Sequence, residues 1–435
     1  MLVIRVIALV FLAISISSAQ ERPSRDLPEP FATKSTIKHP KVIGWPKDKT
    51  PQAPTGFRVQ AFTRELENPR WIYVLPNGDV LIAQSRTLPK PVDKKKDDNE
   101  KSSKEKKQEE GAKQAKTVTG DSPNKITLLR DADQDGKPEK IETFLKDLRQ
   151  PFGMALVKDQ LFIATTDGVH AFPYKTGATS ISSEGMKILD LPAGGYNNHW
   201  TRNLLATPDG NKLYISVGSA SNVAEHGTAE EMLRANILEV NLDGTALRVF
   251  ASGLRNPVGM AWNPMSSHLW TVVNERDELG DDLVPDYLTS VQENGFYGWP
   301  YSYFGSNADP RMKGERPDLV KKAIVPDFDL GSHTASLGLT FYDHKAFPAK
   351  CRDGAFIGQR GSWNRSKFVG YRVAFVPFKD GKPAGMAEDF LTGFIANEDE
   401  VYGRPVGVAV ARDGSLLVCD EPGNVVWRVS ADDAR

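Results

Sequence analysis

The chain has 435 residues, enough for two or three average domains or for one large repetitive domain. Its 55 lysine and arginine residues are balanced by 56 aspartate and glutamate residues, for a net charge of −1. This balance argues against nucleic acid or an anionic membrane as the partner, because both attract basic proteins. The two cysteines, Cys351 and Cys419, make no disulfide framework, and the sequence leaves open one bridge or two buried thiols.

Residues 1–19 have the pattern of a secretory signal peptide. Arg5 precedes an apolar run, and the small residues "SSA" end at Ala19, where cleavage is expected. The run is shorter than a confident membrane span, and no other stretch approaches about 20 apolar residues. We therefore expect no membrane span and a secreted or periplasmic protein. Residues 20–54, rich in proline and lysine, predict an N-terminal arm on the surface.

An apolar–turn–apolar unit recurs along the rest of the chain, and each unit has the chemistry of a β-hairpin. The six units span residues 68–85, 150–168, 201–219, 255–275, 335–361 and 403–423. The spacing leaves room for four short strands per unit, so we predict an all-β fold, a six-bladed β-propeller with four-stranded blades, over residues 55–432. The early strand at 56–62 is expected to complete the last blade. A seven-bladed ring remains an alternative if two units have been merged.

One insertion interrupts the pattern. Residues 89–123 contain many charges of both signs and almost no bulky apolar side chain. Such a segment cannot bury enough surface to offset the entropy of ordering it. It predicts a disordered or loosely helical surface loop, with a binding tail as the alternative.

The segment "DADQDGKPEKIE" matches the calcium-loop pattern D-x-D-x-D-G-x₅-E. Its candidate ligands are Asp131, Asp133, Asp135 and Glu142, and Gly136 would allow the sharp turn. The flanking segments read as strand and short loop rather than as paired helices. The pattern is therefore either a calcium site or a plain turn rich in aspartate and glycine.

Common hydrolase and nucleotide motifs are missing from the sequence. It has no H-E-x-x-H, G-x-S-x-G, P-loop or G-x-G-x-x-G segment, and its seven histidines show no helix-spaced pair for zinc. These gaps disfavour zinc proteases, α/β-hydrolases and nicotinamide enzymes of the Rossmann type.

Polar residues gather where predicted inner strands begin. His199 lies in "NNHWTRN", Arg255 and Asn256 lie in "GLRNPVG", and Arg404 lies in "YGRPVG". Loops that enter the inner strands of a propeller build a site on one face. We therefore expect these residues to converge, and the arginines favour an anionic ligand, because an unpaired arginine is costly to desolvate. By itself, His199 reads equally well as a structural histidine.

The loop 274–288 is rich in acid groups and follows a predicted strand. It carries Glu275, Asp277, Glu278, Asp281, Asp282 and Asp286. It is either a solvated acidic face or a source of carboxylate and carbonyl oxygens for a divalent cation.

At these residues the sequence resembles the glucose/sorbosone dehydrogenase family. The matching segments are "NHWTRNLLATPDGNKLYISVGS", "GLRNPVGMAWNP", "NERDELGDDLVPDYL", "GFYGWPY", "QRGSWNRS" and "GRPVGVAV", and the resemblance covers about residues 55–430. It implies a soluble six-bladed propeller that uses pyrroloquinoline quinone (PQQ) and calcium. The implied reaction is oxidation of an aldose, a sorbosone-like sugar or a related sugar or polyol hydroxyl. The electron acceptor is not identified by the sequence.

The resemblance also implies roles for individual residues. His199 matches the general base that takes the proton of the hydroxyl while hydride moves to the quinone. Arg255 matches an arginine that stabilises the developing oxyanion. The residues implied to hold the cofactor are Gln150, Arg255, Asn256, Arg365 and Arg404. The segment Glu275–Arg276–Asp277 falls where the family offers backbone oxygens to calcium.

Two departures from the family pattern leave the substrate open. The calcium segment carries charged residues where sugar oxidases of the family have small ones. Gln359 and Arg360 stand where many relatives have a histidine before the glycine. Two other functions remain as alternatives: a non-catalytic exported propeller that binds a glycan or a protein partner, and a metal-dependent lactonase.

Overall fold

The computed structural model describes residues 26–88 and 121–432. The predicted signal peptide and residues 89–120 of the charged insertion lie outside the described residues. Within the described part, no helix is long and apolar enough to cross a bilayer.

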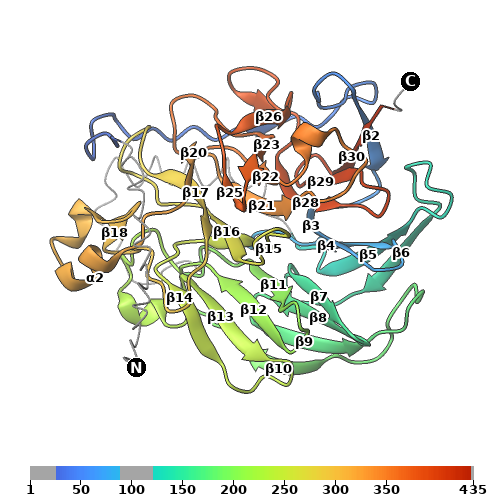
Figure 1. Ribbon diagram of the computed structural model, residues 1–435, viewed down its shortest axis with the longest axis horizontal. Coiled ribbons are helices and arrows are strands. Elements are labelled where there is room, and N and C mark those ends of the chain that lie inside the picture. Colours follow the sequence, from blue (N-terminus) through green and yellow to red (C-terminus); the bar gives the residue numbers. More distant parts are fainter. Residues whose placement is uncertain (1–25, 89–120, 433–435) are drawn as a thin grey trace, which may run out of the picture.

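Six four-stranded antiparallel sheets are arranged around a common centre, as Figure 1 shows. The first three blades consist of β3 (Pro69–Val74), β4 (Val80–Gln84), β5 (Lys125–Arg130) and β6 (Lys140–Leu145); β7 (Met154–Val157), β8 (Gln160–Thr165), β9 (Gly168–Pro173) and β10 (Met186–Asp190); and β11 (Arg202–Ala206), β12 (Lys212–Val217), β13 (Asn236–Asn241) and β14 (Arg248–Ser252).

The remaining blades consist of β15 (Pro257–Trp262), β16 (Leu269–Val273), β17 (Pro285–Ser290) and β20 (Phe328–Ser332); β21 (Ser336–Phe341), β22 (Ala355–Gln359), β23 (Arg372–Val376) and β26 (Glu388–Leu391); and β28 (Pro405–Val410), β29 (Leu416–Asp420), β30 (Val425–Ala431) and β2 (Phe57–Thr63). The predicted six-bladed propeller is confirmed, and the seven-bladed alternative is wrong.

Short elements decorate the blades. They are β1 (Lys41–Val42), β18 (Ser302–Tyr303), β19 (Asn307–Ala308), β24 (Phe378–Lys379), β25 (Lys382–Pro383), β27 (Glu400–Val401), the helix α2 (Pro317–Lys322) and three 3₁₀ turns, Thr228–Glu231, Pro310–Met312 and Ala349–Cys351.

The ring closes where the two ends of the propeller meet in one sheet. Strand β2 pairs antiparallel with β30, with Val59 opposite Val429. The last blade therefore takes its outer strand from the start of the propeller, as the sequence predicts. Because the chain continues from β2 into β3, this hydrogen-bonded pairing holds the first blade against the last.

Glycines set the close packing of the inner strands. Gly153, Gly259, Gly338 and Gly407 each stand third in a segment of the type "PVG" or "SLG", near the start of an inner strand. A Cβ atom on Gly407 would lie 2.7 Å from the carbonyl oxygen of Arg70 in the neighbouring blade. The other three would meet the backbone of the next inner strand in the same way. The repeat therefore marks where blades touch backbone to backbone.

Successive side chains of a strand point to opposite faces of its blade, so they pack into two different hydrophobic cores. On β29, Leu416 and Val418 pack against the fifth blade, whereas Leu417 and Cys419 pack against the first. Both faces of the strand are buried, so it reads as a continuous apolar run. Cys351 packs in the first of these cores and Cys419 in the second, so both are buried free thiols and the sequence question about a bridge is settled. Burial raises the pKa of both thiols.

Residues 26–56 form an extended arm ahead of the propeller, drawn in blue in Figure 1. The amide of Phe31 donates to the carbonyl of Leu279 at 2.8 Å, and β1 pairs parallel with β27. The indole of Trp45 donates to the carboxylate of Asp420 at 2.5 Å. The arm thus lies across loops of the fourth to sixth blades.

Candidate active site at the rim of the propeller

The blades repeat one strand order, and their inner strands β3, β7, β11, β15, β21 and β28 pack around the centre. The loops that enter these strands therefore lie at one rim of the ring. Gln150, His199, Asn256 and Arg404 stand in four of these loops. The structure thus brings to one rim polar residues that are up to about 250 residues apart in the chain.

His199 is half-buried and its ring is oriented by Ser219. Nδ1 lies 2.9 Å from the carbonyl oxygen of Ser219 and 3.0 Å from its hydroxyl. A carbonyl can only accept, so Nδ1 carries the hydrogen in the neutral ring and the lone pair is on Nε2. This is the tautomer that a general base requires.

Arg202, the first residue of β11, holds the loop that carries His199. Its fully buried guanidinium donates from Nη1 to the carbonyls of His199, at 2.8 Å, and Thr201, at 2.9 Å, and from Nη2 to the carbonyl of Pro192, at 2.7 Å. Burial, with the nearby charge of Arg234, lowers the pKa of Arg202. Sequence reasoning missed this residue, although it stands in the motif "NHWTRN".

His199 and Asn256 approach each other across Gly218. A Cβ atom on Gly218 would clash with the Cβ of His199 and the amide oxygen of Asn256. The Ser219 amide donates to the carbonyl of Arg255 at 2.8 Å, which joins the two blades. Oδ1 of Asn256 is buried and accepts no hydrogen bond from the residues the structure describes. An unsatisfied buried acceptor is costly, so this atom suits a bound group that donates a hydrogen bond.

Arg255 is buried and bonded to its surroundings through its guanidinium. Nη1 donates to the carbonyl of Glu275 at 2.5 Å, and Nη2 donates to the side-chain oxygen of Asn222 at 2.9 Å. Nη2 also lies 3.3 Å from the carboxylate of Asp277. The guanidinium is therefore fixed against the segment predicted to bind calcium.

The carboxylates of that segment are already compensated. Arg276 is 0 % exposed, and it pairs with the carboxylate of Glu275 at 3.0 Å and with Asp309 at 3.0 Å. The carbonyl of Asp277 accepts a hydrogen bond from Arg311 at 2.8 Å. A calcium ion needs six to eight oxygen ligands. Guanidinium groups hold several of the oxygens present here, but Oε1 of Glu275 is buried and accepts no hydrogen bond from the described residues. Calcium at Glu275–Arg276–Asp277 therefore stays a prediction.

Glu421 is the centre of a second arginine cluster at the rim. Its carboxylate pairs with Arg70 at 2.6 Å and with Arg360 at 2.5 Å. Burial opposes its ionisation, but Arg360 and Arg70 hold the pKa of Glu421 well below its usual range. Arg404 adds a third guanidinium, which donates to the carbonyl of Gly361 at 2.7 Å.

This arginine cluster has an excess of positive charge. Three guanidinium groups, from Arg70, Arg360 and Arg404, surround one carboxylate, and all four groups are wholly or largely buried. Burial and the charge of Arg360 lower the pKa of Arg404 to about 10. Arg70 also stacks over the indole of Trp200, next to His199, at 5.0 Å. The cluster is therefore an anion-binding environment that adjoins the histidine.

Sequence reasoning noted Arg360 only as a departure and missed both Arg70 and Glu421. The repeat offered a signal for Arg70. It stands in "NPR" at the start of the first unit, where later units have "RNP" and "GRP".

The side-chain amide of Gln150 bonds to the main chain. Nε2 donates to the carbonyl of Arg86 at 2.7 Å. The next residue, Thr87, accepts from the indole of Trp200 at 3.0 Å. Gln150 therefore supports the loop against which the residue next to His199 packs.

Arg365 has different surroundings. It donates to the carbonyl of Asp281 at 2.7 Å and to the carboxylate of Asp282 at 2.8 Å. It lines a cavity of about 740 Å³ beside the fourth and fifth blades, which His199, Arg255 and Arg404 do not line. The structure therefore does not join Arg365 to the arginines around Glu421.

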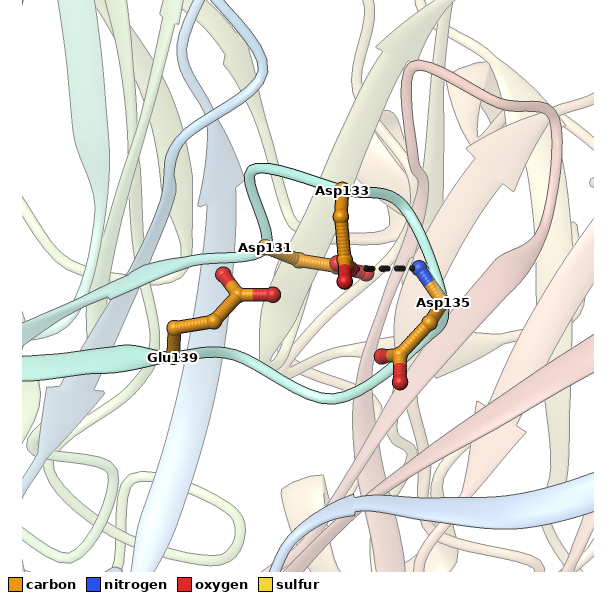
Figure 2. Close-up of side chains that lie close together, drawn as sticks. All are labelled: Asp131, Asp133, Asp135 and Glu139. Atoms are coloured by element: carbon orange, nitrogen blue, oxygen red, sulfur yellow. Dashed lines mark hydrogen bonds between the residues drawn. The ribbon is translucent and has the colours of Figure 1, made fainter.

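The turn between β5 and β6 carries the calcium-like pattern, shown in Figure 2. One oxygen from each of four carboxylates lies within 4.8 Å of the others; they belong to Asp131, Asp133, Asp135 and Glu139. The prediction of Glu142 as a ligand is wrong. The chain returns into β6 at Lys140, so Glu142 stands within the strand, opposite Leu128.

The geometry of this turn suits a hard cation. Oδ1 of Asp131 is buried and accepts no hydrogen bond from the described part of the chain. Burial, followed by the charges of Glu139, Asp135 and Asp133, raises the pKa of Asp131. Gly136 takes a φ of 88°, and its amide donates to Oδ2 of Asp131 at 2.9 Å. The carboxylates repel one another unless a cation joins them.

The loops of an antiparallel blade alternate between its two ends. The turn after β5 therefore lies at the opposite end of the blade from the rim. This places the acidic turn away from His199.

Comparison with known proteins identifies the family of this chain. The family described as a domain of unknown function, DUF7133, matches residues 52–426, and the chain belongs to this family. An uncharacterized protein of Borreliella burgdorferi is 30% identical over 303 residues, which cover 67% of this chain and 79% of that protein.

One further relative and one solved structure carry descriptive names. The aldose sugar dehydrogenase YliI of Escherichia coli is 34% identical over 119 residues, which cover 26% of this chain and 29% of that protein. The holo form of the pyranose dehydrogenase PQQ domain from Coprinopsis cinerea superposes with a TM-score of 0.68 at 18% identity, over 88% of this chain and 97% of that one. This likeness shows that the two proteins share a fold.

Proposed function

We propose that the protein is a PQQ-dependent oxidoreductase that oxidises a hydroxyl group of a sugar or polyol. The observation that carries the proposal is a histidine with its lone pair on Nε2, set beside a buried cluster with two surplus positive charges. The sugar dehydrogenase relative and the PQQ domain with the same fold support it.

The residues at the rim fit a polyanionic quinone. Arg70, Arg360 and Arg404 would hold its carboxylates, because three guanidinium groups share only one carboxylate of the protein. Asn256 would accept a hydrogen bond through its unsatisfied Oδ1. Arg255 would present positive charge to the reacting carbonyl. When bound, PQQ supplies the acceptor for the hydride equivalent.

His199 would perform the proton step. Nε2 takes the proton of the substrate hydroxyl, and Nδ1 keeps its hydrogen bond to the carbonyl of Ser219. The hydroxyl of Ser219 is itself fixed, since it donates to the carbonyl of Ser221 at 2.6 Å. A positioned base of this kind contributes about 10²–10⁴-fold to the rate.

We also propose that calcium binds at the acidic turn, through Asp131, Asp133, Asp135 and Glu139. The ion would neutralise four carboxylates and satisfy Oδ1 of Asp131. Its role would be to stabilise the blade, since the turn lies at the far end from the rim.

The pattern of residues 1–19 leads us to propose export of the protein. The expected mature form would start near Gln20 and accumulate outside the cytoplasm. Cell fractionation with mass determination of the N-terminus checks this.

Quinone titration followed by a substrate panel tests the function. We expect a bound-quinone absorbance change on adding PQQ, and reduction of an artificial acceptor by at least one aldose, polyol or sugar aldehyde. His199→Ala should lower kcat by about 10²–10⁴-fold while the protein still binds quinone. His268→Ala, at a turn far from the rim, is the matched control and should leave kcat unchanged.

Quinone binding without turnover of any sugar, polyol or aldehyde would favour a propeller that binds without catalysis. Absence of quinone binding would overturn the proposal.

A further inference from the structure

Cationic or amide donors hold the carbonyls of Asn274, Glu275 and Asp277, whereas Oε1 of Glu275 is buried and accepts no hydrogen bond from the described residues. The carbonyl of Asn274 accepts from Arg255 at 3.3 Å, and that of Glu275 accepts from the same guanidinium at 2.5 Å. The carbonyl of Asp277 accepts from Arg311 at 2.8 Å and from Asn222 at 3.3 Å. A calcium ion bound at the Glu275 carbonyl would lie within about 5 Å of the Arg255 guanidinium.

The nearby carboxylates are held in the same way. Asp277 is shared between Arg255 at 3.3 Å and His333 at 3.5 Å. Asp309 is shared between Arg276 at 3.0 Å and Arg311 at 2.8 Å. Guanidinium groups thus compensate the negative charge of the segment from three different loops.

We propose that the guanidinium of Arg255 takes the place of a divalent cation at this segment, so that the rim binds its quinone without a metal. This inference rests on the proposed function, because it concerns the same site. The guanidinium is directional and permanently charged, and Asn222 and Glu275 fix its plane. A chelator that removes calcium cannot remove this charge.

The inference distinguishes the rim from the acidic turn. Of the two predicted calcium segments, only the turn at 131–139 has carboxylates that lack a cationic partner in the contacts described above. Metal binding by the protein should therefore map to the turn, and quinone binding should map to the rim.

The first experiment titrates PQQ into protein treated with EDTA, with and without added calcium, and follows the bound-quinone absorbance. We expect the two dissociation constants to agree within about twofold. Quinone binding that requires calcium, and is lost with EDTA, would overturn the inference while leaving the proposed function intact.

The second experiment needs no quinone and remains decisive if none binds. Calcium alone is titrated calorimetrically into the wild type and into Asp133→Asn/Asp135→Asn. We expect one equivalent in the wild type and none in the variant. A calcium equivalent that persists in the variant and disappears in Asp277→Asn would overturn the inference.

The third experiment exchanges the two cations. Arg255→Ala exposes the carbonyls and the carboxylate that the guanidinium covers, so quinone affinity should fall more than tenfold and calcium should restore part of it. Arg255→Lys keeps a positive charge and should lose less affinity, with no response to calcium. Circular dichroism checks that both variants fold, and a calcium response equal in wild type and Arg255→Ala contradicts the inference.

Discussion

Two loops of this protein carry carboxylates at a spacing that suits calcium, and their surroundings differ in one respect. At the turn between β5 and β6, four carboxylates face one another. At the segment Glu275–Arg276–Asp277, each acid group meets a guanidinium. The two loops therefore differ in whether arginine side chains from elsewhere in the chain contact their carboxylates.

Burial explains why the two loops are compensated differently. Glu275 and Arg276 are almost completely buried, so an unpaired charge there would be strongly destabilising. Asp133 and Asp135 are exposed, and water can solvate them until a cation arrives. A buried acid group must be paired with a cation of the fold, whereas an exposed cluster of acid groups is stabilised by water when no cation is bound.

Removing the guanidinium of the buried loop should give the largest effect. Arg276→Ala leaves Glu275 and Asp309 without their partner, and we expect the free energy of unfolding to fall by about 3–5 kcal/mol. Urea denaturation measures it. The control is Arg316→Ala, whose pair with Asp318 is 51% and 55% exposed and should cost less than about 1 kcal/mol. Equal losses in the two variants would contradict the role of burial.

Calcium should stabilise the exposed loop by a smaller amount. At a concentration 100 times its Kd, calcium should raise the free energy of unfolding by about 2.7 kcal/mol. Glu139→Gln should weaken this response, because Glu139 is in the cluster. Glu142→Gln, within the sequence pattern but on β6, is the matched control and should keep it. The reverse outcome would restore the sequence-based assignment.

The fold could be predicted because its signals are local. Hairpin turns recur at regular intervals, and a glycine stands at the same place in four inner strands, including Gly259 and Gly407. The sequence also predicts where each inner strand begins, and this places His199, Asn256 and Arg404 at one rim. These features need only short stretches of chain.

The compensation of charge could not be predicted because it depends on distant residues. Glu421 is 351 positions from Arg70 and 61 from Arg360, and no local pattern joins them. The sequence pattern indicates Glu142, and Glu139 takes its place in the structure because the spacing of a helical calcium loop does not apply to a turn between strands. Sequence patterns located the acid groups but not their partners.

Glu239 is a third acid group that is paired with cations, and the pH dependence of stability measures what this pairing contributes. Arg248, with Lys212 and Tyr214, lowers the pKa of Glu239 from 4.5 to about 2. A lowered folded-state pKa stabilises the protein above the unfolded value, and this contribution is lost as the pH falls from about 4.5 towards 2. Glu239→Gln should therefore cost about 2 kcal/mol at pH 7, and its difference from the wild type should vanish near pH 2.

The matched control for Glu239 uses another partner of the same arginine. Glu293 also pairs with Arg248, at 2.6 Å, but it is 55% exposed. Glu293→Gln should change the free energy of unfolding by less than about 0.5 kcal/mol at either pH. Thermal denaturation at both pH values separates the two variants.

Substitution of Asp131 should have the smallest effect on the free energy of unfolding, and the sign of this effect should depend on calcium. The raised pKa of Asp131 means that its charge destabilises the calcium-free turn at pH 7. Asp131→Asn should therefore stabilise the calcium-free protein by less than about 1 kcal/mol, yet destabilise it relative to wild type in saturating calcium. Asp277→Asn removes an acid group that Arg255 and His333 already hold, so it should destabilise the protein equally in both conditions. Denaturation of both variants in EDTA and in calcium tests this, and a sign change in Asp277→Asn would mean that the two loops bind metal alike.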